Sequence, residues 1–352
     1  MLMYKASAPG SLMLLGEYAV LHDYPAVVCA IDKRISVILE PMDSDDIEII
    51  SALGSHKTTT QTIEIVAPFT FVLATLKLFQ KRLPSGCKIY ITSEFSHEVG
   101  FASSAAVTVA TLAALTSWLK LSYSPLESIL LARNVIQSVQ GTGSGADVAA
   151  CTLGGVVAYR MQPLSADRIH DFIPLTVIYS GNKTPTPDAI KHVNQVFDKH
   201  KHLYKKILQA IGECAAEGIV AIEKNDLKAL GQMMNIQQGL MHALQVNTPK
   251  LQVICDNLNA SPDILGAKIS GSGLGDCIVG LSDPCAIRHP CAICHPRAIC
   301  HPRAGGDPFQ IDSSHSASNI HDNFNSQNYN NVEPITINIS DKGVSCEKIR
   351  YC

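Results

Sequence analysis

Residues Gly100-Phe101-Ala102-Ser103-Ser104-Ala105-Ala106 form a turn of small residues that leads into the apolar stretch 107–115. We predict that this turn opens a helix, whose first backbone N–H groups have no partner within the helix. Together with the positive end of the helix dipole, such groups bind anions. Small side chains let a phosphate approach the backbone, and a hydroxyl there can also bind Mg²⁺. A buried helix capped by serine would give the same pattern, so the assignment depends on other segments.

Two further glycine-rich segments accompany this turn. The first, residues 8–26, contains Pro9-Gly10-Ser11 and Gly16-Glu17, and the second is Lys268-Ile269-Ser270-Gly271-Ser272-Gly273-Leu274-Gly275-Asp276-Cys277. In this order and at these distances, the three segments resemble the motifs of the GHMP kinases, which include galactokinase, homoserine kinase, mevalonate kinase and phosphomevalonate kinase. The resemblance covers residues 4–283 and 331–350. It implies an enzyme that uses ATP and Mg²⁺ to phosphorylate an alcohol.

The resemblance implies an α+β fold of two lobes, the first like ribosomal protein S5 and the second ferredoxin-like. We expect an ATP-binding domain over residues 1–165 and a second domain over 166–283 plus 331–352. Alternating apolar residues predict strands over 31–40, 47–50, 88–92, 156–159, 175–179, 266–270 and 277–281. Helical spacing predicts helices over 63–82, 105–119, 125–140, 187–224, 226–244 and 249–259.

Residues 284–330 differ from the rest of the chain. They contain hexapeptide repeats such as Cys-Ala-Ile-Cys-His-Pro, followed by a stretch rich in Ser, Asn and His. Closely spaced Cys and His can bind Zn²⁺, but a proline in every repeat and the lack of paired C-x-x-C motifs argue against it. We therefore expect a disordered low-complexity insertion, followed by a short strand over 335–339.

The overall composition excludes several classes of partner. The chain has 352 residues, 46% of them hydrophobic and 17% charged, which is typical of a soluble globular protein. Its net charge of −3 gives no general attraction to nucleic acid or anionic membranes, and no apolar run is long enough to span a bilayer. Because the first residues do not have the form of a signal peptide, we expect a cytoplasmic protein. The sequence shows no interface, although many GHMP kinases are homodimers.

A catalytic carboxylate is predicted in the segment Gly141-Thr142-Gly143-Ser144-Gly145-Ala146-Asp147. Phosphoryl transfer to an alcohol requires a carboxylate that accepts or orients the hydroxyl, and positive charge near the phosphates. On its own, the segment fits a helix cap or a turn equally well. The resemblance assigns Asp147 as the catalytic residue, because an S-G-x-D segment supplies it in mevalonate and phosphomevalonate kinases.

The resemblance also implies which residues bind the two substrates. The phosphate-binding positions of the GHMP kinases correspond to Gly100, Ala102, Ser103, Ser104, Ala105, Gly271 and Gly273. In these kinases the position of Ser104 also binds the metal, Mg²⁺. Their positions around the acceptor match Glu17, His22, Lys183 and Thr184. Lys183 could meet a carboxylate or phosphate of the acceptor, or it could be a solvated loop charge.

Three positions depart from the family pattern. Ala102 stands where glycine is more usual, so we expect a slightly reshaped turn, because alanine does not readily adopt a positive φ. Ser11 stands where the family usually has a lysine beside the attacking oxygen. The absence of this lysine should slow phosphoryl transfer unless Lys5 or Lys183 takes its place. Ile136 replaces a Mg²⁺-binding glutamate of mevalonate kinases, whereas phosphomevalonate kinases lack an obvious equivalent.

The acceptor is the least determined part of the prediction. Residues 20–26, 103–110 and 235–241 look like mevalonate kinase, whereas residues 16–21, 143–150 and 275–277 lean towards phosphomevalonate kinase. A phosphorylated acceptor would call for more basic residues than Lys183, which favours mevalonate as the substrate. A binding protein that lost catalysis with the lysine at Ser11 stays an alternative, although such a protein would not need Asp147.

Overall fold

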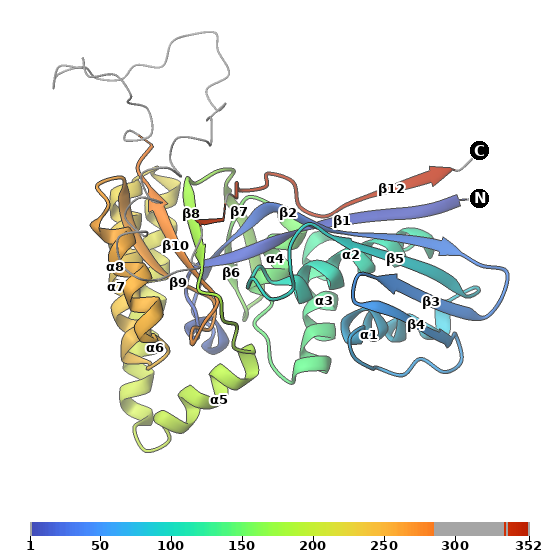
Figure 1. The fold of residues 1–352 in the computed structure, drawn as a ribbon, viewed down its shortest axis with the longest axis horizontal. Coiled ribbons are helices and arrows are strands. Elements are labelled where there is room, and N and C mark those ends of the chain that lie inside the picture. The colour runs from blue at the N-terminus through green and yellow to red at the C-terminus, as the bar shows by residue number, and fades with distance from the viewer. Residues whose placement is uncertain (1, 285–333, 336, 351–352) are drawn as a thin grey trace, which may run out of the picture.

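The computed structural model describes residues 2–284, 334–335 and 337–350, and these form two lobes, each built on a β-sheet (Figure 1). The predicted insertion and its Cys/His repeats lie almost wholly outside the described residues. The first sheet has the order β12-β1-β2-β5-β3-β4, with β6 and β7 continuing from β2, and the second has the order β11-β8-β10-β9. In the first sheet, neighbouring strands are antiparallel except for β3 and β5, which are parallel. The predicted α+β architecture of two lobes is confirmed.

The strands and helices have the following bounds. The first sheet contains β1 (Leu2–Leu15), β2 (Ala26–Pro41), β3 (Asp46–Ser51), β4 (Gly54–Thr59), β5 (Cys87–Ser93), β6 (Val156–Arg160), β7 (Ser165–His170) and β12 (Ser345–Arg350). The second contains β8 (Leu175–Tyr179), β9 (Ile264–Ser270), β10 (Cys277–Ser282) and β11 (Pro334–Ile335). The helices are α1 (Thr70–Leu78), α2 (Ser103–Trp118), α3 (Pro125–Gln140), α4 (Ala146–Leu153), α5 (Thr186–Val196), α6 (Lys201–Glu223), α7 (Leu227–Ala243) and α8 (Pro249–Ala260), with short 3₁₀ turns η1 (Ala19–His22) and η2 (Gln80–Arg82).

In the first lobe, α2 and α4 pack directly on β1 and β2, and α1 and α3 pack against α2. Alanine, valine and threonine dominate α2, so its backbone can lie close to the sheet, and ten of its residues are buried. Helix α3 begins as predicted, because Ser124 and Glu127 form a reciprocal capping box and Pro125 occupies the first helical position. This packing holds the start of α2 at one end of the lobe.

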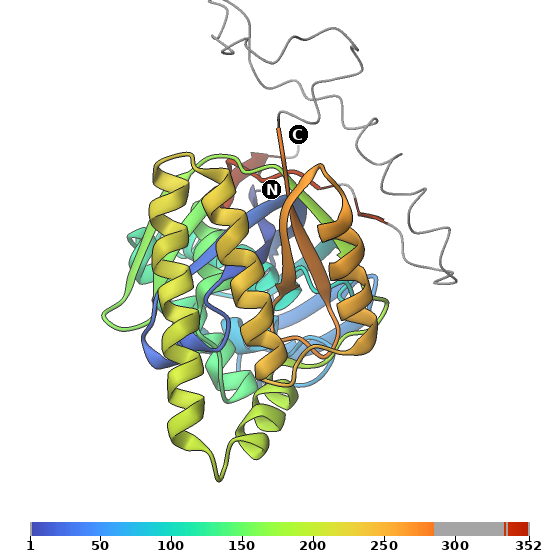
Figure 2. The same cartoon turned by 90° about the vertical axis from the view of Figure 1, so that its left-hand side faces the viewer.

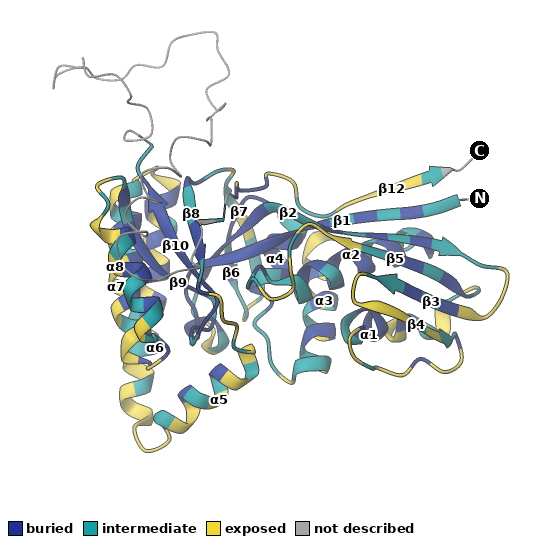
Figure 3. Cartoon of the chain, in the orientation of Figure 1, coloured by how far each residue is buried: buried dark blue, intermediate teal, exposed yellow. Residues whose placement is uncertain are grey.

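In the second lobe, α7 and α8 cover the sheet, and α6 packs against α7 (Figure 2). A separate apolar cluster lies between the two sheets and includes Leu12 and Leu14 of β1, Val177 of β8 and Val279 of β10. Strand β10 and the second half of β1 are buried along their length, while α5 and α6 expose long outer faces (Figure 3). The shared cluster therefore fixes the lobes against each other.

Several boundaries differ from the sequence-based predictions. The helix expected over 63–82 begins only at Thr70, because Pro68 lacks an N–H and restricts the residue before it. The pattern over 187–224 divides into α5 and α6, where Phe197 stacks on the ring of Tyr204 at 5.2 Å. The strand expected over 335–339 is described only at Pro334–Ile335, with an isolated bridge from Ile339 to Ile31.

The assignment of the C-terminal residues to the second lobe is wrong for β12. This strand pairs with β1 along six residues, so it extends the first sheet and brings both ends of the described chain together (Figure 1). Strand β7 also belongs to the first sheet, through pairing with β6, and the first lobe therefore extends past residue 165 to His170. The pairing of β1 with β12 joins strands from opposite ends of the chain, and local periodicity does not reveal it.

Candidate active site

A cleft of about 1170 Å³ opens between the lobes and brings the three glycine-rich segments together. Its walls come from the end of β1, the turn before α2, the first turn of α4, the loop between β8 and α5, and the turn between β9 and β10. Nine of the predicted site residues line it: Glu17, Gly100, Ala102, Ser103, Ser104, Ala105, Asp147, Lys183 and Gly271.

The turn over residues 100–106, named the phosphate turn here for its predicted role, opens α2 as predicted. Helix α2 starts at Ser103, and no side chain among the described residues caps it, so its first N–H groups are available to an anion. Gly100 has a φ of +79°, and a Cβ there would lie 3.0 Å from Oδ1 of Asp276. Ala102 adopts the left-handed conformation with φ 52° and ψ 46°. Alanine therefore takes a conformation that it does not readily adopt, and this residue bears the strain.

Replacing Ala102 with glycine should stabilise the protein by about 1 kcal/mol, because only glycine adopts the left-handed region without a steric cost. Urea unfolding would measure the change. Ala105→Gly, two residues inside α2, is the matched control and should destabilise by about 1 kcal/mol. Equal destabilisation by both changes would show that Ala102 is not strained.

Asp147 and Ser11 form a pair at the base of the cleft. Ser11 Oγ donates a hydrogen bond of 2.8 Å to Asp147 Oδ1, and no other hydrogen bond to this carboxylate occurs among the described residues. Burial raises the pKa of Asp147, the hydrogen bond from Ser11 lowers it, and the charge of Glu17 raises it. The Ser11 N–H also donates to Phe101 O at 3.2 Å, which ties β1 to the phosphate turn. Ser11 thus orients one carboxylate oxygen and leaves the other for a ligand.

The only lysine or arginine among the described residues that line the cleft is Lys183. Its Nζ donates to the backbone oxygen of His97, so it reaches across from the second lobe to the loop before the phosphate turn. Lys5, the other candidate, instead pairs at 3.5 Å with Glu347 of the neighbouring strand β12, where both side chains are solvent-exposed, so it does not replace the missing lysine. Ile136 does line the cleft, but it is apolar and buried, so it offers no metal ligand.

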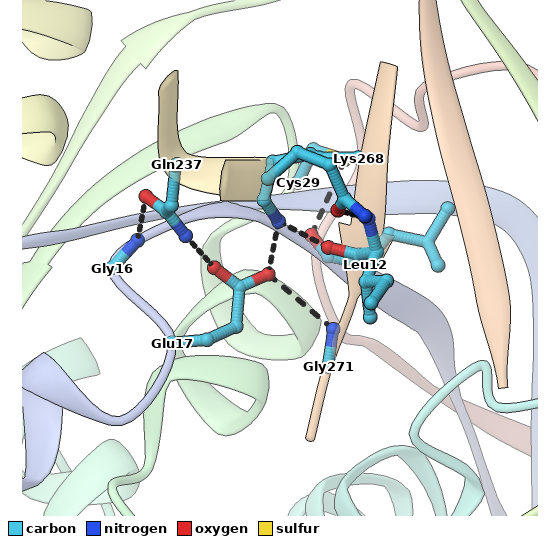
Figure 4. A network of polar contacts seen from close by, with 9 residues as sticks. Leu12, Gly16, Glu17, Cys29, Gln237, Lys268 and Gly271 are labelled. Atoms are coloured by element: carbon cyan, nitrogen blue, oxygen red, sulfur yellow. Dashed lines mark hydrogen bonds and ion pairs between the residues drawn. The ribbon is translucent and has the colours of Figure 1, made fainter. Parts of the chain in front are cut away.

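Glu17 belongs to a buried polar network (Figure 4). It is 2% exposed and forms an ion pair with Lys268, which is fully buried, and its Oε1 also accepts from Gly271 N–H at 3.4 Å. Its Oε2 accepts from Gln237 Nε2, while Gln237 Oε1 accepts from Gly16 N–H at 3.0 Å. Both carboxylate oxygens of Glu17 are therefore occupied. Through them, the glycine-rich segments 8–26 (the first motif) and 268–277 (the third motif) are held against α7.

Sequence reasoning missed the partners of Glu17. The lysine of the third motif is visible in the sequence, but its burial and its pairing with Glu17 depend on how the lobes pack. Burial lowers the pKa of Lys268, and the charge of Glu17 raises it, so the carboxylate of Glu17 favours the charged form of Lys268. Gln237 lies on the buried face of α7, where its amide bridges Glu17 and the backbone of Gly16.

Three predicted residues do not line the cleft. His22 lies in a separate hollow, where its ring meets that of Tyr204 edge-on at 5.9 Å. Thr184 Oγ1 donates to Leu274 O at 3.0 Å, so it supports the third motif. Gly273 has a φ of +75°, and a Cβ there would lie 2.7 Å from Val246 O, so its role is close packing. The structure therefore does not bring His22 to the acceptor side.

The residues of the cleft fit a nucleotide with its metal ion. The free amides of α2 suit the phosphates, and an apolar wall suits the base; this wall consists of Leu53, Pro68, Phe69, Phe71, Val72 and Ile91. Ser104 and Asp147 line the cleft near the phosphate turn and offer oxygen ligands of the kind that Mg²⁺ takes. No group of three or more His, Cys, Asp or Glu that could hold a metal ion occurs in the described part of the chain, so phosphate oxygens would have to complete the shell.

Comparisons with known proteins agree with this geometry. Residues 70–155 match the model of the GHMP kinases N-terminal domain, and residues 219–286 match that of the GHMP kinases C-terminal domain. The mevalonate kinase of Pyrococcus abyssi is 30% identical over 296 residues, which cover 79% of this chain and 88% of that protein.

Solved structures share the fold. The Methanococcus jannaschii mevalonate kinase superposes with a TM-score of 0.71 at 20% identity, covering 95% of this chain and 98% of the other. Streptococcus pneumoniae phosphomevalonate kinase, in complex with phosphomevalonate and AMPPNP, gives 0.66 at 19% identity, covering 79% and 92%. These likenesses confirm the fold of two lobes. Within the described residues, no helix has the length and apolarity needed to cross a membrane.

Proposed function

Since the chain belongs to the GHMP kinase family, and is an ATP-dependent small-molecule kinase, we propose that it phosphorylates mevalonate to 5-phosphomevalonate. The observation that carries the proposal is the cleft itself, which holds Asp147 beside the phosphate turn. Mevalonate kinases such as that of Pyrococcus abyssi are similar to this chain over most of their length, which supports this acceptor.

The residues of the cleft would divide the reaction between them. The amides at the start of α2 bind the transferred phosphate and orient it towards the acceptor. Asp147 receives the proton of the acceptor hydroxyl. The hydroxyl oxygen forms a bond to the γ-phosphorus of ATP, and the bond between this phosphorus and the oxygen that leaves with ADP breaks. Ser11 holds Asp147 in place through Oδ1. Bound Mg²⁺ would neutralise charge on the phosphates, with Ser104 as a candidate ligand.

Lys183 provides the recognition of the acceptor in this proposal. Mevalonate carries one carboxylate, which a single lysine can pair with, whereas 5-phosphomevalonate also carries a phosphate. Because Lys183 is the only lysine or arginine that lines the described cleft, the charge of the site matches the smaller anion. The phosphomevalonate kinase among the similar folds makes 5-phosphomevalonate the second candidate.

ADP release with Mg·ATP should be observed with mevalonate and not with 5-phosphomevalonate at the same concentration. Turnover of 5-phosphomevalonate alone would make the protein a phosphomevalonate kinase. If ATP binds but neither acceptor reacts, the protein acts on another acceptor or has lost catalysis.

Lys183→Met should raise the KM for mevalonate by about 10–100-fold, because a hydrogen bond to a charged group contributes roughly 1.5–3 kcal/mol. Steady-state kinetics at saturating ATP would measure this. Lys191→Met removes an exposed lysine of α5 outside the cleft and is the matched control. An unchanged KM in Lys183→Met would mean that Lys183 is a solvated loop charge.

A further inference from the structure

Asp276 is a cleft residue to which the proposed mechanism gives no role. It lies in the turn between β9 and β10 with a φ of +64°, which is unusual for a residue other than glycine. Its side chain lines the cleft but is only 7% exposed. Oδ1 is buried and has no hydrogen-bond partner in the described structure. An unpartnered buried carboxylate oxygen is costly, so it indicates a ligand that completes it.

The surroundings of Asp276 identify the ligand's chemistry. A Cβ added to Gly100 would lie 3.0 Å from Asp276 Oδ1, so the carboxylate lies against the phosphate turn. Burial raises the pKa of Asp276 to about 6, the charge of Lys183 lowers it, and that of Asp147 raises it. Above this pKa the carboxylate is an anion. Phosphates bound at the turn would repel it unless a cation lay between them.

We propose that Asp276 is a ligand of the divalent cation that accompanies the nucleotide phosphates. The proposal rests on the proposed kinase function, and it assigns a metal ligand in the third motif. Mg²⁺ is typically held in kinases by one or two carboxylates together with phosphate oxygens, which is what the turn and Asp276 would supply.

The test measures ATP binding to the full chain without an acceptor, by calorimetry, with EDTA and with saturating Mg²⁺ at alkaline pH. Asp276→Asn keeps the shape of the side chain, and asparagine tolerates the left-handed backbone, so the fold should persist. We expect Mg²⁺ to tighten ATP binding in the unmodified protein and to do so at least about tenfold less in the variant. Without Mg²⁺, the variant should bind ATP as well as the unmodified protein or better, because one negative charge is gone.

Asp32→Asn is the matched control, because Asp32 also has a buried, unpartnered Oδ1 but lies outside the cleft. Its response to Mg²⁺ should equal that of the unmodified protein. Full Mg²⁺ tightening in Asp276→Asn, or none in the unmodified protein, would overturn the proposal. Paramagnetic resonance of Mn²⁺ with ATP gives a second readout, and Asp276→Asn should weaken the bound signal. Neither readout involves the acceptor, so Mg²⁺-dependent ATP binding without turnover of mevalonate would contradict the proposed function alone.

Discussion

Asp147→Asn should lower kcat by about 10²–10⁴-fold while the affinity for ATP changes little. The amide keeps the shape of the side chain and can still accept from Ser11 Oγ, but it cannot receive the proton of the acceptor. Coupled ADP release would give kcat, and calorimetric titration would give the dissociation constant for ATP. Asp45→Asn, an exposed carboxylate between β2 and β3, is the control and should leave both values unchanged.

The pH dependence provides a second check on Asp147. Because burial raises the pKa of this carboxyl, the fraction that can accept a proton falls as the pH drops through that value, and kcat should fall with it. Ser11→Ala removes the hydrogen bond that lowers the pKa, so the fall in rate should move to higher pH. If Asp147→Asn kept most of its rate, or if Ser11→Ala left the pH profile in place, Asp147 would not be the base.

Lys268→Met should destabilise the protein by about 3–5 kcal/mol, because it leaves the buried carboxylate of Glu17 without its cation. The double variant Glu17→Gln with Lys268→Met removes both charges and should recover much of this loss, since an apolar or neutral pair needs no charge compensation. Urea unfolding of both single variants and the double variant gives the coupling energy of the pair.

The control for this cycle is Lys57→Met, which breaks an exposed contact of 3.3 Å with Glu48 and should change stability by less than about 1 kcal/mol. Destabilisation by Lys268→Met of no more than this control would show that the network does not hold the lobes together. A strictly additive double variant would show that Glu17 and Lys268 act independently.

Local signals explain why much of the fold could be predicted. Helix α3 matches its prediction because a capping serine, a proline and the end glycine, Gly141, mark both ends within the sequence. Strand β8 follows Pro174 and also matches. The single helix predicted over 187–224 was wrong at Phe197, where α5 ends and the ring of Phe197 stacks on that of Tyr204.

The sequence by itself indicated the α+β class and the glycine-rich turn before α2, because small residues and glycines act through nearby backbone geometry, whereas the prediction of Asp147 depended on the resemblance to the GHMP kinases. Only the tertiary structure decided that Ser11 bonds Asp147 across 136 positions, that Glu17 is held by Lys268, and that β12 joins the first sheet. It also placed His22 outside the cleft and Asp276 against Gly100. Burial and charge pairing arise when distant segments pack, and no local pattern contains that information.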